Sequence, residues 1–224
     1  VMVLGSAVDG VESSGSVTSV ITGGADTETD DALFSRMLLA YQETAHGGAK
    51  NDYKRWALAV AGVTRAWDNP NGFGIGTVVV YIMFDDANAD YDGFPQGTDG
   101  VAANEPRGIA ATGDQLAVAD YIFGDDRQPV TALVHVVSPI AFPVDFTITG
   151  LTAISDAKRA EISQAIKDVF REHADPKGGT VELSYIEVAI AAISGTTPFV
   201  ITSPMANITP ELGYLPTLGE ITYA

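Results

Sequence analysis

The order in which helix-like and strand-like apolar patterns follow one another is the feature of this chain that most limits its fold. Apolar residues repeat at helical spacing between Ser155, a residue type that favours a helix N-terminus, and His173. A continuous apolar run of strand length occupies residues 77–84. Helices and strands are interleaved, but without the regular strand–helix alternation of a doubly wound parallel sheet. The pattern therefore predicts an α+β fold.

The predicted elements form two groups. Helices are expected from residues 27–31 to 46, and at 49–61, 114–123, 155–173 and 184–193. Strands are expected at residues 63–67, 77–84, 130–137, 142–148, 199–202 and 220–223. These elements predict two small sheet-plus-helix subdomains, at residues 25–138 and 139–224, that meet near Ser138 and Pro139. Residues 1–24, which are rich in Gly, Ser, Thr and Val, are predicted to form an extended N-terminal arm.

The charge balance limits the kinds of partner. The chain of 224 residues carries 12 Lys and Arg against 29 Asp and Glu, which gives a formal net charge of −17. Such a surface repels phosphate backbones and anionic lipid headgroups, so we expect neither nucleic acid nor a membrane as a partner. It suits instead a protein that binds cations or docks onto basic patches of other proteins.

Residue types that carry chemistry are either missing or isolated. The chain has no Cys, which excludes thiol catalysis, disulfides and Cys-based zinc sites. The glycines at 72, 74 and 76 lead into a strand, whereas a dinucleotide-binding loop must lead into a helix. His46, His135 and His173 have no second His at metal-ligand spacing, and no Gly-x-Ser-x-Gly motif is present. We therefore predict no catalytic residue, and a hydrolase is only a third hypothesis.

One acidic segment resembles a calcium-binding loop. Asn88, Asp90 and Asp92 stand at the first, third and fifth positions of a calcium loop, with Gly93 at the sixth and Asp99 at the twelfth. However, Asn at the first position, Asp at the twelfth and the preceding strand all depart from that pattern. The simpler explanation of the segment is an acidic hairpin, because Asp, Asn and Gly favour turns. A calcium-dependent adhesion or receptor-binding module, with a structural calcium ion as its cofactor, is therefore the alternative function.

A series of short motifs carries a family resemblance. In chain order they are GGADTETD (23–30), DYKRWA (52–57), GVTRAW (62–67), GTVVVY (76–81), PVTA (129–132), GGTVELS (178–184) and LPTLG (215–219). In this order and spacing they resemble the baseplate J-like proteins of contractile phage tails, including the Mu-type and P2-type baseplate wedge proteins. The resemblance extends from about residue 10 to the C-terminus, and this chain looks like the C-terminal portion of such a protein.

The resemblance implies a structural role rather than an enzymatic one. Members of this family form wedges around a central hub and have no recognised active site, so no catalytic residues are carried over. The implied partners are other wedge and hub proteins and further copies of the chain. The implied location is the tail baseplate of a virion or a related injection system, after assembly in the cytoplasm of the bacterial host.

Overall fold

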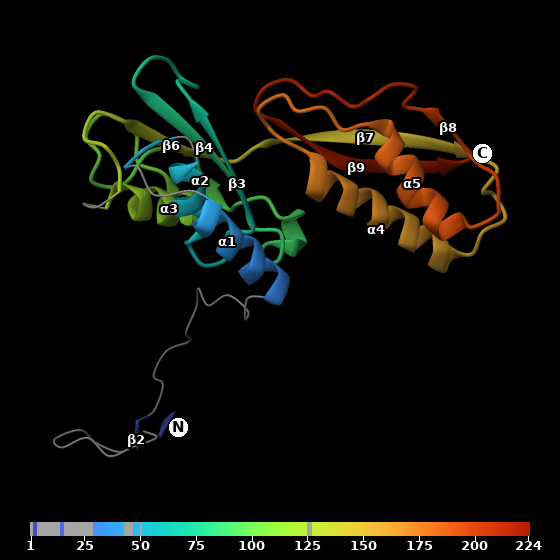
Figure 1. Cartoon of the computed structure of the whole chain (residues 1–224), viewed down its shortest axis with the longest axis horizontal. Coiled ribbons are helices and arrows are strands. Elements are labelled where there is room, and N and C mark those ends of the chain that lie inside the picture. The colour runs from blue at the N-terminus through green and yellow to red at the C-terminus, as the bar shows by residue number, and fades with distance from the viewer. Residues whose placement is uncertain (1, 4–13, 16–28, 43–46, 50, 125–126) are drawn as a thin grey trace.

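The protein is described by a computed structural model that covers residues 2–3, 14–15, 29–42, 47–49, 51–124 and 127–224. Most of these residues form two lobes, and each lobe has a three-stranded sheet with helices packed on it (Figure 1). Within the predicted arm, β1 (Met2–Val3) and β2 (Ser14–Gly15) pair in antiparallel fashion. The rest of the arm, and His46, lie outside the described residues. The predicted α+β class is confirmed.

The first lobe contains the central strand β4, flanked by β3 and β6. Its elements are α1 (Asp30–Gln42), α2 (Asp52–Leu58), β3 (Arg65–Pro70), β4 (Thr77–Met83), the 3-10 turn η1 (Ala89–Tyr91), β5 (Gly97–Thr98), α3 (Gly113–Phe123) and β6 (Leu133–Val137). The β3 and β4 strands are antiparallel and run from Arg65 opposite Met83 to Pro70 opposite Val78. The β4 and β6 strands are parallel, and α3 lies between them in the chain.

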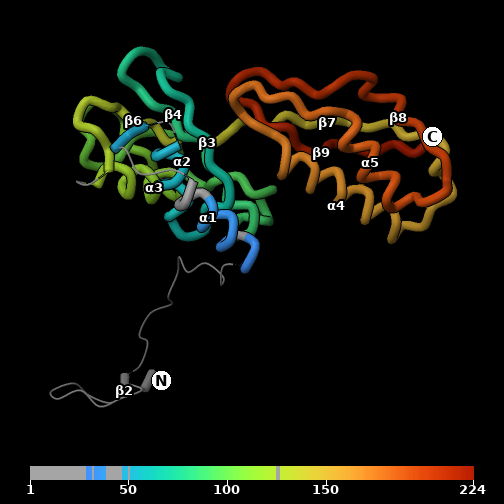
Figure 2. The backbone as a smooth tube through the Cα atoms, viewed as in Figure 1, coloured from blue at the N-terminus to red at the C-terminus, as the bar shows by residue number. Residues whose placement is uncertain are grey.

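The second lobe has the same mixed pairing around its own central strand. Its elements are β7 (Ile140–Thr149), α4 (Asp156–His173), α5 (Leu183–Ser194), β8 (Val200–Ser203) and β9 (Tyr214–Tyr223). The β7 strand pairs in antiparallel fashion with β8 and in parallel with β9. The tube in Figure 2 shows the chain passing from the first lobe to the second between β6 and β7, at Ser138 and Pro139.

Local sequence signals explain the helix starts, and one of them corrects a prediction. The Ser155 hydroxyl accepts a hydrogen bond from the Lys158 amide, so α4 begins where it was predicted. The helix expected at 49–61 is shorter, because Asn51 has left-handed backbone angles (φ 75°). The Asp52 carboxylate then accepts hydrogen bonds from the amides of Gly48 and Ala49, both at 2.9 Å, and α2 starts at Asp52.

The last strand is longer than predicted. A strand was expected only at 220–223, but β9 begins at Tyr214 and pairs along β7 from Ile140 onwards. Pro216 and Gly219 by themselves indicate a break in a strand. In the structure the register between β7 and β9 shifts between Val144 and Phe146, and this bulge accommodates the residues around Gly219.

The two lobes have separate cores that share one strand. Alternate residues of β4, including Val80 and Ile82, pack with α2 and α3 in the core of the first lobe. Met83, at the end of the same strand, belongs to the core of the second lobe and is only 1% exposed. Trp67 of β3 and Phe94 pack against that second core as well. The lobes are therefore joined by apolar packing.

The β7 strand extends beyond its partner β8. Only Thr147, Ile148 and Thr149 pair with β8, so in the described part of the chain residues 140–146 have a strand neighbour on one side only. The Ile140 amide donates a hydrogen bond to the Gly213 carbonyl, next to β9. Successive backbone amides of a strand point alternately to its two sides. The backbone of Pro143 therefore faces the open side.

Met83→Ala tests whether one strand couples the two lobes. We expect the free energy of unfolding to fall by about 2–5 kcal/mol, because the truncation leaves a cavity in the second core. Urea unfolding followed by Trp fluorescence, which reports Trp56 and Trp67 in the first lobe, and by far-UV circular dichroism should give coincident transitions. The matched control is Met205→Ala, since Met205 is 89% exposed. Equal stability of the two variants would contradict the coupling.

Candidate functional site

The ion pairs at the contact between the two lobes, which we call the seam, centre on the carboxylate of Asp85. Asp85 follows β4 directly, and the Arg65 guanidinium from β3 donates to both of its oxygens, Nε to Oδ2 at 2.8 Å and Nη2 to Oδ1 at 2.8 Å. The Thr64 hydroxyl donates to Oδ2 at 2.5 Å, and the Asp85 amide donates back to that hydroxyl at 2.9 Å. This bidentate, charge-assisted arrangement fixes the first-lobe side of the seam.

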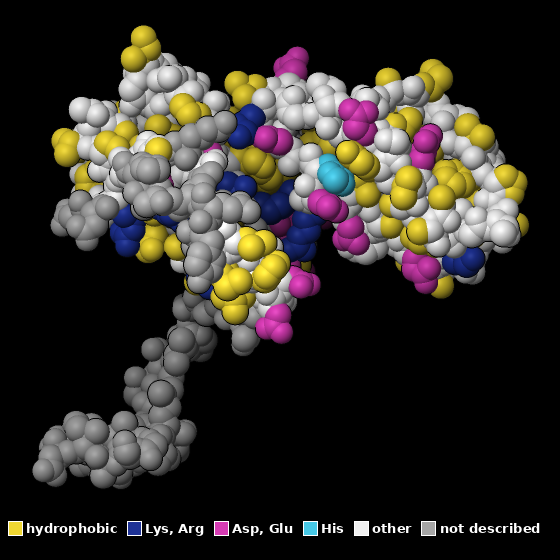
Figure 3. Space-filling model, in the orientation of Figure 1, with side chains coloured by type: hydrophobic (Ala, Val, Ile, Leu, Met, Phe, Trp, Pro, Cys, Tyr) yellow, Lys and Arg dark blue, Asp and Glu magenta, His cyan; other side chains and the backbone are white. Residues whose placement is uncertain are grey.

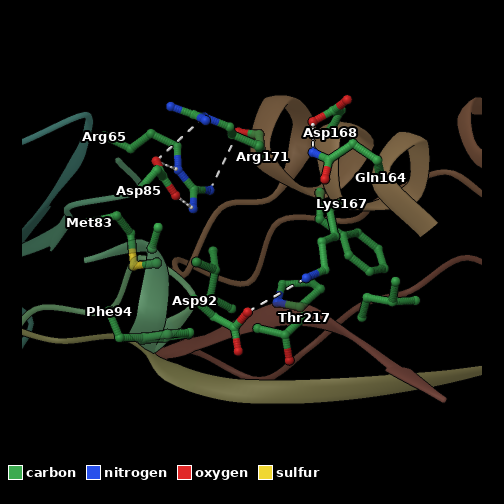
Figure 4. A pocket seen from close by; sticks show the side chains of 15 residues that line it. Arg65, Met83, Asp85, Asp92, Phe94, Gln164, Lys167, Asp168, Arg171 and Thr217 are labelled. Atoms are coloured by element: carbon green, nitrogen blue, oxygen red, sulfur yellow. Dashed lines mark hydrogen bonds and ion pairs between the residues drawn. The ribbon is translucent and has the colours of Figure 1, made fainter. Parts of the chain in front are cut away.

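Helix α4 supplies the second-lobe side. Arg171 Nε lies 3.6 Å from Asp85 Oδ2 (Figure 4). Arg171 Nη2 donates to Asp86 Oδ1 at 3.1 Å. The Arg171 carbonyl accepts from Arg65 Nη1 at 3.4 Å. One helical turn earlier, Lys167 Nζ lies 3.7 Å from Asp92 Oδ1. Cations of α4 thus meet acidic residues of the loop that follows β4.

Two cavities flank these ion pairs. A cavity of about 290 Å³ lies between Asp85, Phe94, Lys167 and β9, and a second of about 250 Å³ lies beside Lys54 and Trp67. Lys and Arg side chains gather there between the two lobes, at what we call the waist of the molecule (Figure 3). Because most of these cations have carboxylate partners within the described chain, the site is suited to holding the lobes together.

Opposing effects set the protonation of Asp85. Burial by itself raises the pKa of the Asp85 carboxyl, but the hydrogen bond and charge of Arg65, with help from Thr64 and Arg171, outweigh it. The pKa of Asp85 is therefore held below its usual range. A similar ion pair forms between Arg107 and Glu105. The Arg107 guanidinium donates to both oxygens of the buried Glu105 carboxylate and lowers the pKa of Glu105.

Three of the four residues predicted to hold calcium take part in other interactions. The Asn88 side-chain amide donates to the Phe94 carbonyl at 3.1 Å and to Asp114 Oδ2 at 2.7 Å. Asp99 Oδ1 accepts from the Ser138 amide at 2.8 Å, Asp92 pairs with Lys167, and Asp90 is exposed. Among the described residues there is no group of three or more His, Cys, Asp or Glu that could hold a metal ion. Calcium binding at Asn88, Asp90, Asp92 and Asp99 stays a prediction.

The two described histidines contact aromatic rings. His135 of β6 meets Phe73 edge-on, with ring centroids 5.0 Å apart. Burial lowers the pKa of His135, and the negative charge of Glu105 partly opposes this. His173 at the end of α4 stacks on Tyr185 with centroids 4.1 Å apart. Neither ring has a hydrogen bond to a serine hydroxyl within the described part of the chain, which a hydrolase triad would require.

Large apolar side chains are exposed at several places on the surface. The tip of the β3–β4 hairpin carries Phe73 and Ile75, and Ile75 is fully exposed. One stripe lies on α1 and consists of Leu33, Phe34, Met37 and Leu38. Another lies on α5 and includes Tyr185 and Val188, and apolar side chains are scattered over both lobes in Figure 3. Exposed apolar surface of this kind is typical of proteins that bind other proteins.

The sequence analysis missed the seam. Arg65 and Asp85 are 20 positions apart, and Arg171 lies a further 86 positions along the chain, so no local spacing connects them. Two signals were nevertheless present. Lys167 and Arg171 stand four positions apart, on one face of a helix, and the run Val78 to Phe84 is apolar at every position. A strand of that composition is buried on both faces.

No helix in the described residues is both long enough and apolar enough to cross a membrane.

Asp85→Asn tests the electrostatics of the seam. Because the folded-state pKa of Asp85 is lowered, its contribution to stability is present above the unfolded-state pKa of about 3.9 and is lost as the pH falls through the folded-state pKa. We expect the variant to be less stable by about 1–3 kcal/mol at pH 7. The difference from the wild type should shrink between about pH 5 and pH 2 in urea-unfolding series. Asp90→Asn, at an exposed residue of the same loop, is the control, and a pH-independent difference would contradict the assignment.

The calcium prediction has a direct test in thermal unfolding. If Asn88, Asp90, Asp92 and Asp99 bind calcium, calcium chloride raises the Tm of the wild type but not that of Asp90→Asn, because a ligand that binds only the folded state stabilises it. Magnesium chloride at equal ionic strength is the control. A Tm that calcium leaves unchanged would exclude the site.

Comparison with known proteins identifies the family of the chain. The model of the baseplate J-like central domain matches residues 45–138, and that of the baseplate J-like protein C-terminal domain matches residues 142–224. The two matches cover the described parts of both lobes apart from α1 and residues 139–141.

Three relatives match over different lengths. JayE of Escherichia coli strain K12 is 31% identical over 222 residues, which are 99% of this chain and 76% of that protein. Baseplate protein gp47 of Escherichia phage Mu is 34% identical over 212 residues, or 90% of this chain and 53% of that protein. The Mu-like prophage FluMu protein gp47 of Haemophilus influenzae is 45% identical over 67 residues, or 30% and 19% of the two chains. The family resemblance found in the sequence is confirmed, and the chain belongs to the baseplate J-like family.

Proposed function

We propose that this chain is a structural component of the baseplate of a contractile phage tail or a related injection system. The observation that carries the proposal is the relationship to baseplate protein gp47 of phage Mu, together with two baseplate J-like matches that follow one another along the chain. Within the baseplate we assign the chain to the wedge, where it acts through contacts with other proteins.

The construction of the two lobes supports a structural role. Met83, Trp67 and Phe94 of the first lobe pack on the second core, and Arg171 and Lys167 of α4 pair with acidic residues of the first lobe. Apolar packing and ion pairs thus hold the lobes as one body. A component of this kind transmits force between its neighbours instead of bending at the link between its lobes.

The surface supports binding to other proteins. Ile75 and Phe73 form an apolar tip on the β3–β4 hairpin, and the stripes on α1 and α5 are separate from it. We propose that the partners are other wedge proteins, hub proteins and further copies of this chain, assembled in the cytoplasm of the bacterial host. A net charge of −17 favours basic surfaces on the wedge and hub partners and opposes binding to nucleic acid.

Removal of the chain from the phage or prophage that encodes it tests the proposal. We expect particles without a complete baseplate, because a wedge component contacts several neighbours at once. Supplying the wild-type chain or Met205→Ala should restore the baseplate in electron micrographs, and a tag on the chain should label the baseplate end of the tail. Particles with a complete baseplate and full infectivity in the absence of the chain would contradict the proposal.

A further inference from the structure

The geometry of the β3–β4 hairpin favours an asparagine followed by a glycine at its tip. Asn71 has left-handed backbone angles (φ 59°), which asparagine adopts more readily than most residues with a side chain. At the next position, a Cβ on Gly72 would lie 2.8 Å from Asn69 Nδ2 and 2.8 Å from Val79 Cγ2, so only glycine fits there. Two local packing requirements thus place the pair Asn71–Gly72 in the turn.

This pair has the chemistry of deamidation, the reaction that makes asparagine a thermolabile residue. The backbone nitrogen of Gly72 attacks the side-chain Cγ of Asn71, and the new C–N bond closes a succinimide ring. The Asn71 side-chain nitrogen leaves as ammonia and takes up the amide hydrogen of Gly72. Water then opens the ring at either carbonyl and leaves aspartate or isoaspartate. The reaction needs only water as co-reactant, and Gly72 has no side chain to hinder the attacking nitrogen.

The reacting groups are exposed and weakly held. The Asn71 residue is exposed at the tip of the hairpin. The Gly72 amide donates to the Asn69 carbonyl at 3.3 Å, and the Asn71 Oδ1 accepts from the Gly76 amide, also at 3.3 Å. Hydrogen bonds longer than about 3.2 Å are weak. A small rotation of the Asn71 side chain is therefore enough to bring Cγ to the Gly72 nitrogen.

Asn88 has the opposite arrangement and provides an internal reference. Its side-chain amide donates to the Phe94 carbonyl at 3.1 Å and to Asp114 Oδ2 at 2.7 Å. The next residue is Ala89, whose side chain hinders the attacking nitrogen. Both features oppose ring closure at Asn88.

We propose that Asn71 is a deamidation site of the folded protein and that isoaspartate forms there. Isoaspartate adds one carbon to the backbone between the Cα of position 71 and the Gly72 nitrogen. The turn is closed by the Asn71 amide on the Thr77 carbonyl at 2.7 Å and by the Gly74 amide on the Asn71 carbonyl at 2.9 Å. The added carbon moves the Asn71 carbonyl away from the Gly74 amide and loosens the tip that carries Phe73. The inference goes beyond the proposed function and does not depend on it.

Peptide mapping by mass spectrometry of the full chain, aged at mildly alkaline pH, tests the proposal. We expect conversion at Asn71 to be at least about 10-fold faster than at any other asparagine, because only there do an unhindered nitrogen and a weakly held side chain coincide. Labelling by a protein isoaspartate methyltransferase should identify isoaspartate at the same position. The other asparagines of the sequence are Asn51, Asn69, Asn88, Asn104 and Asn207.

Asn71→Gly is the matched variant, because glycine keeps the left-handed turn and has no side-chain amide. It should keep the Tm of the wild type and gain no methyltransferase label. Chymotryptic cleavage after Phe73 should become faster in the aged wild type but not in the aged variant. An Asn71 that stays intact in the folded chain while the urea-unfolded chain is converted would overturn the proposal, since the hairpin would then protect the pair. Conversion to aspartate alone would overturn the isoaspartate assignment.

Discussion

The structure depends on a single strand, β4, that serves two hydrophobic cores. Its side chains alternate, so one set packs with α2 and α3 while Met83 on the other set enters the second core. Because both faces are needed, neither lobe can expose β4 without loss of its own core. The ion pairs of Arg65, Asp85 and Arg171 lie around this apolar contact and fix the angle between the lobes. Apolar packing thus joins the two lobes, and the ion pairs help to set their relative orientation.

Sequence patterns predicted the elements better than the relations between them. The start of α4 after Ser155 was predicted correctly, because a cap and a regular apolar repeat are both local signals. Tyr214 to Gly219 of β9 was missed, since Pro216 and Gly219 favour a break and only the distant partner β7 stabilises the strand. The seam was missed for the same reason, since its charges come from three distant segments. Contacts across the fold, rather than the propensities of single residues, decided these regions.

Charge has two roles in this acidic chain. Over most of the surface, excess Asp and Glu repel nucleic acid and other polyanions. At the waist, by contrast, Arg65, Lys167 and Arg171 are matched with carboxylates from the other lobe or the neighbouring strand. The pairs are local, so they persist where long-range repulsion is screened by salt. Attraction inside the molecule and repulsion outside it are thus carried by different residues.

The open side of β7 has a consequence for self-association. An uncovered strand edge with the apolar residues Ile140, Ala141 and Phe142 resembles the template on which amyloid-like growth begins. Pro143 stands on that edge, where it has no amide hydrogen to offer to an incoming strand. An incoming strand would lack one of its hydrogen bonds in the middle of the ladder. Pro143 thereby opposes strand-by-strand polymerisation of the chain along β7.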